Sequence, residues 1–377
     1  MTLINRNSIL QITYDNYFVI IGDNNSDLNY NYLRKQITMN NYNNNNNYNL
    51  YEYDKMIGYR KRIKILWVDF FFIPPHIRLK YYQTRTFIAN QIDNLNSISL
   101  KDNLFYNMKK YFPNIYKKFI ADSFILSNDY IQQDNKVYIS RPTILINDKK
   151  NQLIACSGDD IVIVYDTNSL EKAKLNLYKY TSVLMSEYIT NPLLFMNKKF
   201  HLRMYYIITI NNNILRTYLM NFGFIYTALL PYKNAEYSNK EIHDTHYKST
   251  EKNYMFPKDM HYLGNDNINN IIKQMRNILN CTSQILYNNK ICNYENIANG
   301  FYIFGIDFMI KENYDVMLIE CNCTPGYKRK EKDYTLEKEL FSFINNVSFK
   351  PLLTNTDPII NKNDISTIPV FKKKIQY

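Results

Sequence analysis

Glycine is scarce in this chain, with 8 glycines among 377 residues. The sequence contains neither a GxxxxGKS/T nor a GxGxxG pattern, so the two common glycine-rich loops that hold phosphates are excluded. Its 5 cysteines form no CxxC pair and no zinc-ligand spacing, which argues against a structural zinc site. Because the number of cysteines is odd and no signal peptide is evident, we expect a reducing compartment.

Long apolar runs are missing as well. The longest, Ile63–Pro75, contains Lys64 and Asp69 and is too short to cross a bilayer. We therefore expect a cytoplasmic protein that has no membrane partner. A hydrophobic content of 46% with 21% charged residues is typical of a globular chain, and this length predicts two or three subdomains.

Positive charge is in excess, with a formal net charge of +12 at pH 7. Such a charge favours an acidic partner, and nucleic acid, nucleotide phosphates and acidic protein tails all qualify. Nucleic acid fits least well, because the basic residues are scattered and the aromatic residues follow the periodicity of a core.

Hydrophobic patterning predicts a mixture of strands and helices, with strands dominating the middle of the chain. Strands are predicted at 9–22, 63–72, 124–126, 137–141, 153–164, 183–189, 199–211 and 215–227. Helices are predicted at 100–111, 169–177, 267–287 and 336–345. The Asn-rich segment at about 27–49 is interpreted as an insertion of helix and loop, in which residues 43–47 form a flexible loop.

The most informative stretch is a predicted β-hairpin at residues 304–322. Two apolar, β-prone arms flank the polar turn Lys311–Asp315. If Lys311 pairs with Val316, the register gives three cross-strand pairs: Met309 with Leu318, Asp307 with Glu320, and Gly305 with Asn322. Two facing carboxylates on an apolar sheet would repel each other and lose hydration, and a divalent cation would remove both problems.

The ligand set of this hairpin consists of oxygen atoms alone. The carboxylates of Asp307 and Glu320 and the amide of Asn322 suit Mg²⁺ shared with substrate phosphates better than they suit zinc. The alternative is a solvent-facing hairpin that carries ordinary surface acids.

A second polar pattern lies on the predicted strand that begins at Lys199. Phe200, Leu202 and Met204 share one face, while the other face carries Lys199, His201 and Arg203. A row of cations near an acidic hairpin is what a magnesium–polyphosphate site needs. The alternative is a solvent-exposed strand face.

Four motifs give the chain a resemblance to the tubulin–tyrosine ligase-like branch of the ATP-grasp enzymes, from about Tyr17 to Val347. They are Gly22-Asp23-Asn24-Asn25-Ser26, Lys199-Phe200-His201-Leu202-Arg203, His243-Asp244-Thr245-His246, and the stretch Phe304 to Pro325. The resemblance implies an α+β class, with an ATP-grasp fold and an N-terminal α/β (pre-ATP-grasp) subdomain. We expect this subdomain with its Asn-rich insertion at 1–110, a central ATP-grasp subdomain at 111–195, a C-terminal one at 196–350 and a tail at 351–377.

The same resemblance implies a site in which ATP lies between two β-sheets. Mg²⁺ would be bound by Asp307, Glu320 and Asn322. The adenine would meet Glu187 and the main chain of Ile189, and the phosphates would meet Lys101, Arg141, Lys199, His201 and Arg203. Of these, Arg203 and Lys199 are the expected catalytic cations. Taken alone, Glu187 could equally be a strand-edge acid, and Lys101 a solvated helix lysine.

The activity that the resemblance implies is ATP-dependent carboxylate–amine ligation through an acyl-phosphate. The partners would be ATP, an amino acid and an acidic protein acceptor such as tubulin. Four positions depart from the family pattern: Arg141 replaces lysine, His201 aspartate, Tyr226 arginine and His246 asparagine. Two alternatives therefore stay open, a nucleotide-binding ATP-grasp protein without ligase activity and a ligase that acts on another acceptor.

Overall fold

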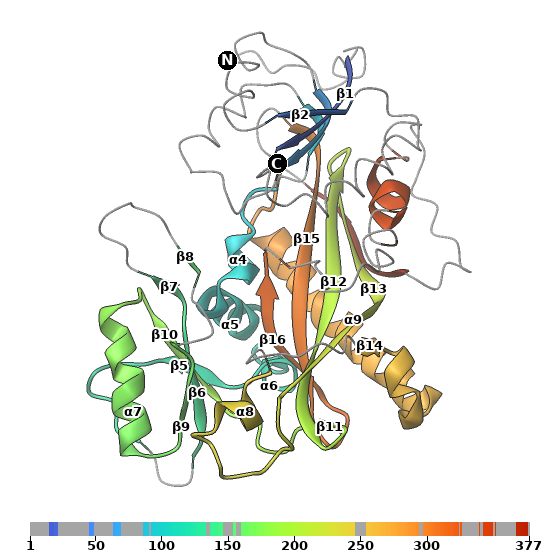
Figure 1. The fold of residues 1–377 in the computed structure, drawn as a ribbon. Coiled ribbons are helices and arrows are strands. Elements are labelled where there is room, and N and C mark those ends of the chain that lie inside the picture. Colours follow the sequence, from blue (N-terminus) through green and yellow to red (C-terminus); the bar gives the residue numbers. More distant parts are fainter. Residues whose placement is uncertain are drawn as a thin grey trace.

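The structure is a computed structural model, which describes part of the chain. The described residues are 15–21, 45–48, 63–68, 86–89, 92–132, 136–145, 154–155, 160–245, 254–293, 297–323, 325, 339, 342–349, 351 and 367–375. Within them, a long sheet runs through the molecule and a smaller sheet lies beside one end of it (Figure 1). The motif at Gly22–Ser26 lies outside the described residues, as does His246.

Among the described residues, eleven strands form the large sheet, in the order β14-β13-β12-β15-β4-β3-β1-β2, with β11, β16 and β17 paired to β12, β15 and β13. The strands are β1 (Asp15–Ile21), β2 (Asn45–Tyr48), β3 (Ile63–Val68), β4 (Thr86–Ala89), β11 (Leu194–Phe195), β12 (Lys198–Asn211), β13 (Ile214–Thr227), β14 (Tyr254–Phe256), β15 (Ile297–Ile310), β16 (Val316–Asn322) and β17 (Thr367–Lys374). The strands β1 to β4 pair in parallel, and the long strands β12, β13 and β15 pair antiparallel. This mixture confirms the predicted α+β class.

The smaller sheet is antiparallel and has the order β5-β10-β6-β9. Its strands are β5 (Ser123–Ile125), β6 (Tyr138–Pro142), β9 (Val162–Val164) and β10 (Val183–Glu187), and β7 (Ile144–Leu145) and β8 (Ile154–Ala155) form a separate ribbon. Helix α7 (Thr167–Lys174) packs beside this sheet (Figure 1). It begins with a capping box, because the Asp166 carboxylate accepts a hydrogen bond from the Ser169 main-chain N–H and the Ser169 hydroxyl oxygen accepts one from the Asp166 main-chain N–H.

The remaining helices cover the large sheet. They are α4 (Asn96–Ser99), α5 (Lys101–Tyr111), α6 (Tyr116–Phe119), α8 (Lys240–His243) and α9 (Asn265–Asn288), with a short 3₁₀ turn at Lys258–Leu263 and a π turn at Asn345–Phe349. A second 3₁₀ turn, Leu175–Tyr178, continues α7 beside the smaller sheet. The apolar stripe of α9, which includes Ile271, Met275 and Ile278, is fully buried in the main core. No helix among the described residues is long and apolar enough to span a membrane.

The structure corrects one expectation and extends another. Residues 45–47 were expected in a flexible loop, but Asn45–Tyr48 forms β2, whose main chain pairs in parallel with β1. Main-chain pairing overrides the low strand propensity of Asn here. Residues 367–374 of the expected tail form β17 on the edge of β13. The subdomain boundaries remain a proposal.

Candidate functional site

The hairpin β15–β16 is present, but its register is not the simple one. Ile310 pairs with Val316, so Met309 faces Met317 and not Leu318. A β-bulge at Ile319 then inserts one extra residue in β16 and restores the predicted pairs of Asp307 with Glu320 and Gly305 with Asn322. The facing carboxylates were therefore predicted correctly, although the register near the turn was wrong by one residue.

The two faces of the hairpin differ in character. Ile306, Phe308, Leu318 and Cys321 lie in the main core, which confirms Cys321 as a packing residue. The opposite face carries the polar pair and faces the smaller sheet. Asp307 is only 2% exposed, so the alternative of a solvent-facing hairpin with surface acids is wrong.

Asp307 is held by a two-point ion pair with Arg203 of the neighbouring strand β12. The Arg203 Nη2 lies 2.8 Å from Oδ2, and Nε donates to Oδ1. Both side chains are buried. Burial alone would lower the pKa of Arg203, but the charge and hydrogen bonds of Asp307 outweigh burial and raise that pKa above its usual value.

His201 lies beside this pair on the same face of β12. Its Nδ1 is 2.6 Å from the Thr245 hydroxyl, and its Nε2 is 3.9 Å from Asp307 Oδ2. The His201 ring stacks on Tyr226, with centroids 5.0 Å apart and planes at 10°. Tyr226 therefore lines the site, at the position where the family pattern has arginine.

Lys199, the third cation of the strand, points to a different partner. It is 3% exposed, and its Nζ donates to the Tyr188 hydroxyl at 2.6 Å. That hydroxyl lies 2.7 Å from His243 Nδ1. Burial lowers the pKa of Lys199 to about 7 against the attraction of Asp244, and burial together with Lys199 lowers the pKa of His243 to about 4. All three cations of the strand are buried, so the solvent-exposed alternative is wrong.

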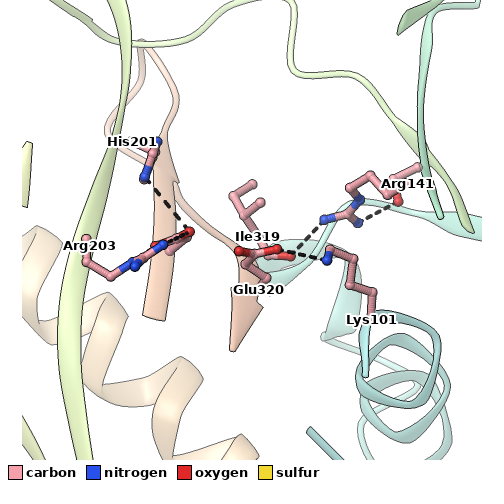
Figure 2. A network of polar contacts seen from close by, with 8 residues as sticks. Lys101, Arg141, His201, Arg203, Ile319 and Glu320 are labelled. Carbon is pink, nitrogen blue, oxygen red and sulfur yellow. Dashed lines mark hydrogen bonds and ion pairs between the residues drawn. The ribbon is translucent and has the colours of Figure 1, made fainter. Parts of the chain in front are cut away.

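Glu320 meets cations from the other side. The Lys101 Nζ, in the first turn of α5, lies 3.1 Å from Glu320 Oε2, and both side chains are about one-fifth exposed at 22% and 23%. Lys101 is thus an ion-paired residue and not a solvated helix lysine. Figure 2 shows Lys101 and Arg141 on one side of Glu320, with His201 and Arg203 farther away on the other side.

Arg141 connects the smaller sheet to the bulge. Its guanidinium donates to the Ile319 carbonyl at 2.7 Å (Figure 2), and it also donates to the Ser186 hydroxyl at 2.7 Å. Burial lowers the pKa of Arg141, and the nearby Glu320 charge opposes this shift. Its Nε is buried and forms no hydrogen bond within the described residues, so one donor is available to an anion.

The two residues predicted to contact adenine lie at and just after the end of β10, with Glu187 as its last residue and Ile189 two residues beyond. Glu187 is exposed and pairs with Tyr138, while Ile189 is buried in a small apolar cluster. The other members of that cluster are Met309, Met317, Ile319 and Ala121. Within the described residues the Ile189 main chain forms no hydrogen bond, so it can meet a ligand.

The structure therefore brings most of the predicted residues to one polar band between the sheets. Asp307 lies opposite Glu320 on the hairpin, and Asn322 follows Glu320 on the same face of β16, so the three supply two carboxylates and an amide. No three His, Cys, Asp or Glu side chains group as metal ligands in the described part of the chain. The oxygen donors of Asp307, Glu320 and Asn322 are of the kind that fits Mg²⁺.

Sequence reasoning missed several residues of the site. Alternation places Met309 on the face of Asp307 but gives it no role. Met317 joins that face only because of the bulge at Ile319. Tyr188 contacts Lys199 of the large sheet, and Ser186 contacts Arg141 on the neighbouring strand of the smaller sheet. No local pattern in the sequence marks such contacts.

Comparison with known proteins gives consistent matches. The model of the "Tubulin-tyrosine ligase family" matches residues 81–356, a range that contains every site residue described above. The chain is 26% identical over 246 residues to a Saccharomyces cerevisiae protein named "Probable tubulin–tyrosine ligase", covering 61% of this chain and 32% of that protein. It is 24% identical over 208 residues to a Schizosaccharomyces pombe protein with the same description, covering 54% and 50%.

A third relative is a Tetrahymena thermophila protein named "Probable alpha-tubulin polyglutamylase". The identity is 26% over 307 residues, covering 67% of this chain and 68% of that protein. The chain thus spans about a third of the length of the Saccharomyces cerevisiae relative and half of the length of the Schizosaccharomyces pombe relative.

Proposed function

The chain belongs to the tubulin–tyrosine ligase family, as its motifs predicted, and from this premise we propose that it is an ATP-dependent carboxylate–amine ligase. It would join an amino acid to a protein acceptor through an acyl-phosphate. The observation that carries the proposal is the pairing of Asp307 with Glu320 on one sheet face, between two groups of cations.

In this proposal Asp307, Glu320 and Asn322 hold Mg²⁺. When bound, the ion would neutralise charge on the transferred phosphate. Their fit rests on the oxygen-only donor set and on their alignment along one face of β15–β16.

The phosphates of ATP would lie between two sets of cations. Lys101 and Arg141 come from the side of α5 and the smaller sheet, and Arg203, His201 and Lys199 come from β12. The unpaired Arg141 Nε supports this role, because a buried donor without an acceptor is costly unless a ligand supplies one.

The adenine would contact Glu187 and the Ile189 main chain. Next to Ile189 lies the apolar cluster with Met309 and Met317, which offers a nonpolar surface to a planar base. The main-chain groups of Ile189 would supply hydrogen bonds to the edge of the base.

The reaction has two steps. A carboxylate oxygen attacks the γ-phosphorus of ATP, the bond to the bridging oxygen breaks and ADP leaves. An amine then attacks the acyl carbon of the acyl-phosphate, the carbon–oxygen bond breaks, inorganic phosphate leaves and the amine loses a proton. Arg203 and Lys199 would stabilise the charge that develops on the phosphoryl group. Positioning of the reactants and electrostatic stabilisation of the transition state would then provide most of the rate enhancement.

The acceptor would be acidic. A net charge of +12 attracts an acidic protein tail, and the relatives' names point to tubulin. Tyr226 in the site supports a different acceptor as the second candidate, because a tyrosine lacks the charge that would pair with a carboxylate. The proposed location is the cytoplasm.

Mass spectrometry tests this function. Purified tubulin and total cell protein are incubated with the enzyme, ATP and labelled amino acids. A Glu320→Gln variant serves as the inactive form, and Asp266→Asn, an exposed acid of α9, is the matched control. ATP-dependent labelling of tubulin supports the proposal, and labelling of other proteins alone identifies the second candidate. Mg-ATP binding without any product would mean a nucleotide-binding protein, and equal labelling by both variants contradicts the site.

A further inference from the structure

We propose that the Arg203 guanidinium binds the Asp307 carboxylate until a nucleotide enters the site. Metal binding at the hairpin would therefore depend on the nucleotide. The inference rests on the proposed function, since it concerns the same site. Arg203 would then have two roles: it contacts phosphate, and it prevents the metal from binding Asp307 before the nucleotide has bound.

The first observation is the completeness of the ion pair. Two nitrogens of Arg203 meet both oxygens of Asp307, and the side chains are 7% and 3% exposed. A bidentate, charge-assisted pair of this kind is among the stronger polar interactions in proteins. A metal ion that approaches Asp307 without a nucleotide must displace the Arg203 guanidinium.

The second observation is that the chain is shaped around Arg203. A Cβ at Gly305 would lie 2.9 Å from Arg203 Cδ and 2.7 Å from Pro325 Cβ, and a Cβ at Gly223 would lie 2.3 Å from the Arg203 carbonyl oxygen. The contact at Gly223 is with the Arg203 main chain, so of these two glycines Gly305 is the one that borders the Arg203 side chain. Gly305 leaves room for the guanidinium to reach Asp307.

The third observation is the contrast with Glu320. Its ion pair with Lys101, at 3.1 Å, joins two partly exposed groups, and such pairs are weaker than buried ones. The Glu320 carboxylate is therefore easier for a metal ion to approach than that of Asp307, whose two oxygens face Arg203 in a buried pair. Phosphate oxygens also accept the guanidinium of arginine, so the nucleotide would release Asp307 as it receives the guanidinium of Arg203.

Thermodynamic linkage makes this exchange measurable. If the nucleotide strengthens metal binding by some factor, the metal must strengthen nucleotide binding by the same factor. Loosening Arg203 should tighten metal binding without nucleotide and reduce that factor.

The test measures Mn²⁺ binding by water-proton relaxation, which distinguishes protein-bound Mn²⁺ from Mn²⁺ on free nucleotide. Wild type is compared with Arg203→Lys, which keeps the charge and loses the two-point geometry, with and without the non-hydrolysable analogue AMP-PNP. Arg216→Lys is the matched control, because Arg216 is a buried arginine on β13 opposite Thr209, away from the hairpin. Circular dichroism checks that each variant is folded.

We expect wild type to bind Mn²⁺ at least about tenfold more tightly with AMP-PNP than without it. Arg203→Lys should bind Mn²⁺ without nucleotide roughly fivefold to tenfold more tightly than wild type, and Arg216→Lys should match wild type. If Arg203→Lys fails to fold, Gly305→Ala is used instead, because its Cβ displaces the Arg203 side chain while the charges of Arg203 and Asp307 remain. This variant should also bind Mn²⁺ more tightly than wild type without nucleotide.

The outcomes separate this inference from the proposed function. Equal Mn²⁺ affinity with and without AMP-PNP in wild type overturns the inference and leaves the metal site standing. Unchanged nucleotide-free affinity in both Arg203→Lys and Gly305→Ala also overturns it. If wild type binds neither Mn²⁺ nor AMP-PNP, the proposed function itself fails, and the inference with it.

Discussion

Replacing Asp307 with Asn removes the carboxylate charge that faces Arg203 and leaves the shape of the side chain almost unchanged. Replacing Glu320 with Gln makes the same chemical change on the adjacent strand, at the directly opposite position. The two substitutions therefore form a matched pair that differs chiefly in burial.

The expected difference in stability follows from that burial. Arg203 and Asp307 are 5% and 2% exposed, and breaking a buried ion pair by removing one partner destabilises a protein by ~3–5 kcal/mol. Asn retains one acceptor, so Asp307→Asn should lower the free energy of unfolding by about 3 kcal/mol. The Lys101–Glu320 pair is 22% and 23% exposed, so Glu320→Gln should lower it by about 1 kcal/mol or less.

Urea unfolding at pH 7, followed by far-UV circular dichroism, measures both values. A gap of about 2 kcal/mol between the variants is the expected result. Equal free energies of unfolding, within about 0.5 kcal/mol, would refute the reasoning, because they would mean that the buried pair stabilises the fold no more than the exposed one does.

Three further predictions concern other parts of the molecule. Burial lowers the pKa of Lys199 from 10.5 to about 7, so between these values the folded protein holds fewer protons than the unfolded chain and its stability rises with pH; Lys199→Met should remove that rise in urea titrations from pH 6 to 10. Arg141→Lys cannot bind the Ile319 carbonyl and the Ser186 hydroxyl in the same forked way, and calorimetry should show Mg-ATP affinity reduced roughly tenfold. Met275→Ala opens a cavity under α9 and should cost about 3 kcal/mol, whereas exposed Arg276→Ala should change stability by less than about 0.5 kcal/mol in the same assay.

Local periodicity explains which parts of the fold were predictable. The strands β12 and β13, the helix α9 and the second arm of the hairpin were predicted at nearly their observed bounds. Each has an unbroken apolar pattern that tertiary contacts reinforce. The alternation of Lys199, His201 and Arg203 likewise predicted a shared cationic face. The first arm of the hairpin was predicted from Phe304, but β15 begins at Ile297.

The remaining features depend on contacts between distant segments. The bulge at Ile319 changes the hairpin register, and its carbonyl is bound by Arg141 from a strand of the other sheet. Strand β2 forms from an Asn-rich stretch through main-chain pairing, which side-chain propensity does not report. The sequence predicted cations near the acids, but not that Arg203 would pair with Asp307 and Lys199 with Tyr188, because those partners lie on separate elements.

Calorimetric titration of ATP into the protein tests the central claim most directly. The claim is that the paired acids of β15–β16 and the cations around them form a magnesium–nucleotide site. Wild type should bind ATP in the presence of Mg²⁺ and lose at least about tenfold in affinity when EDTA removes the ion. Glu320→Gln, which is expected to stay folded, should bind ATP as weakly as EDTA-treated wild type, whether or not Mg²⁺ is present. Asp266→Asn should behave as wild type. Mg²⁺-dependent binding that Glu320→Gln leaves unchanged would contradict the account.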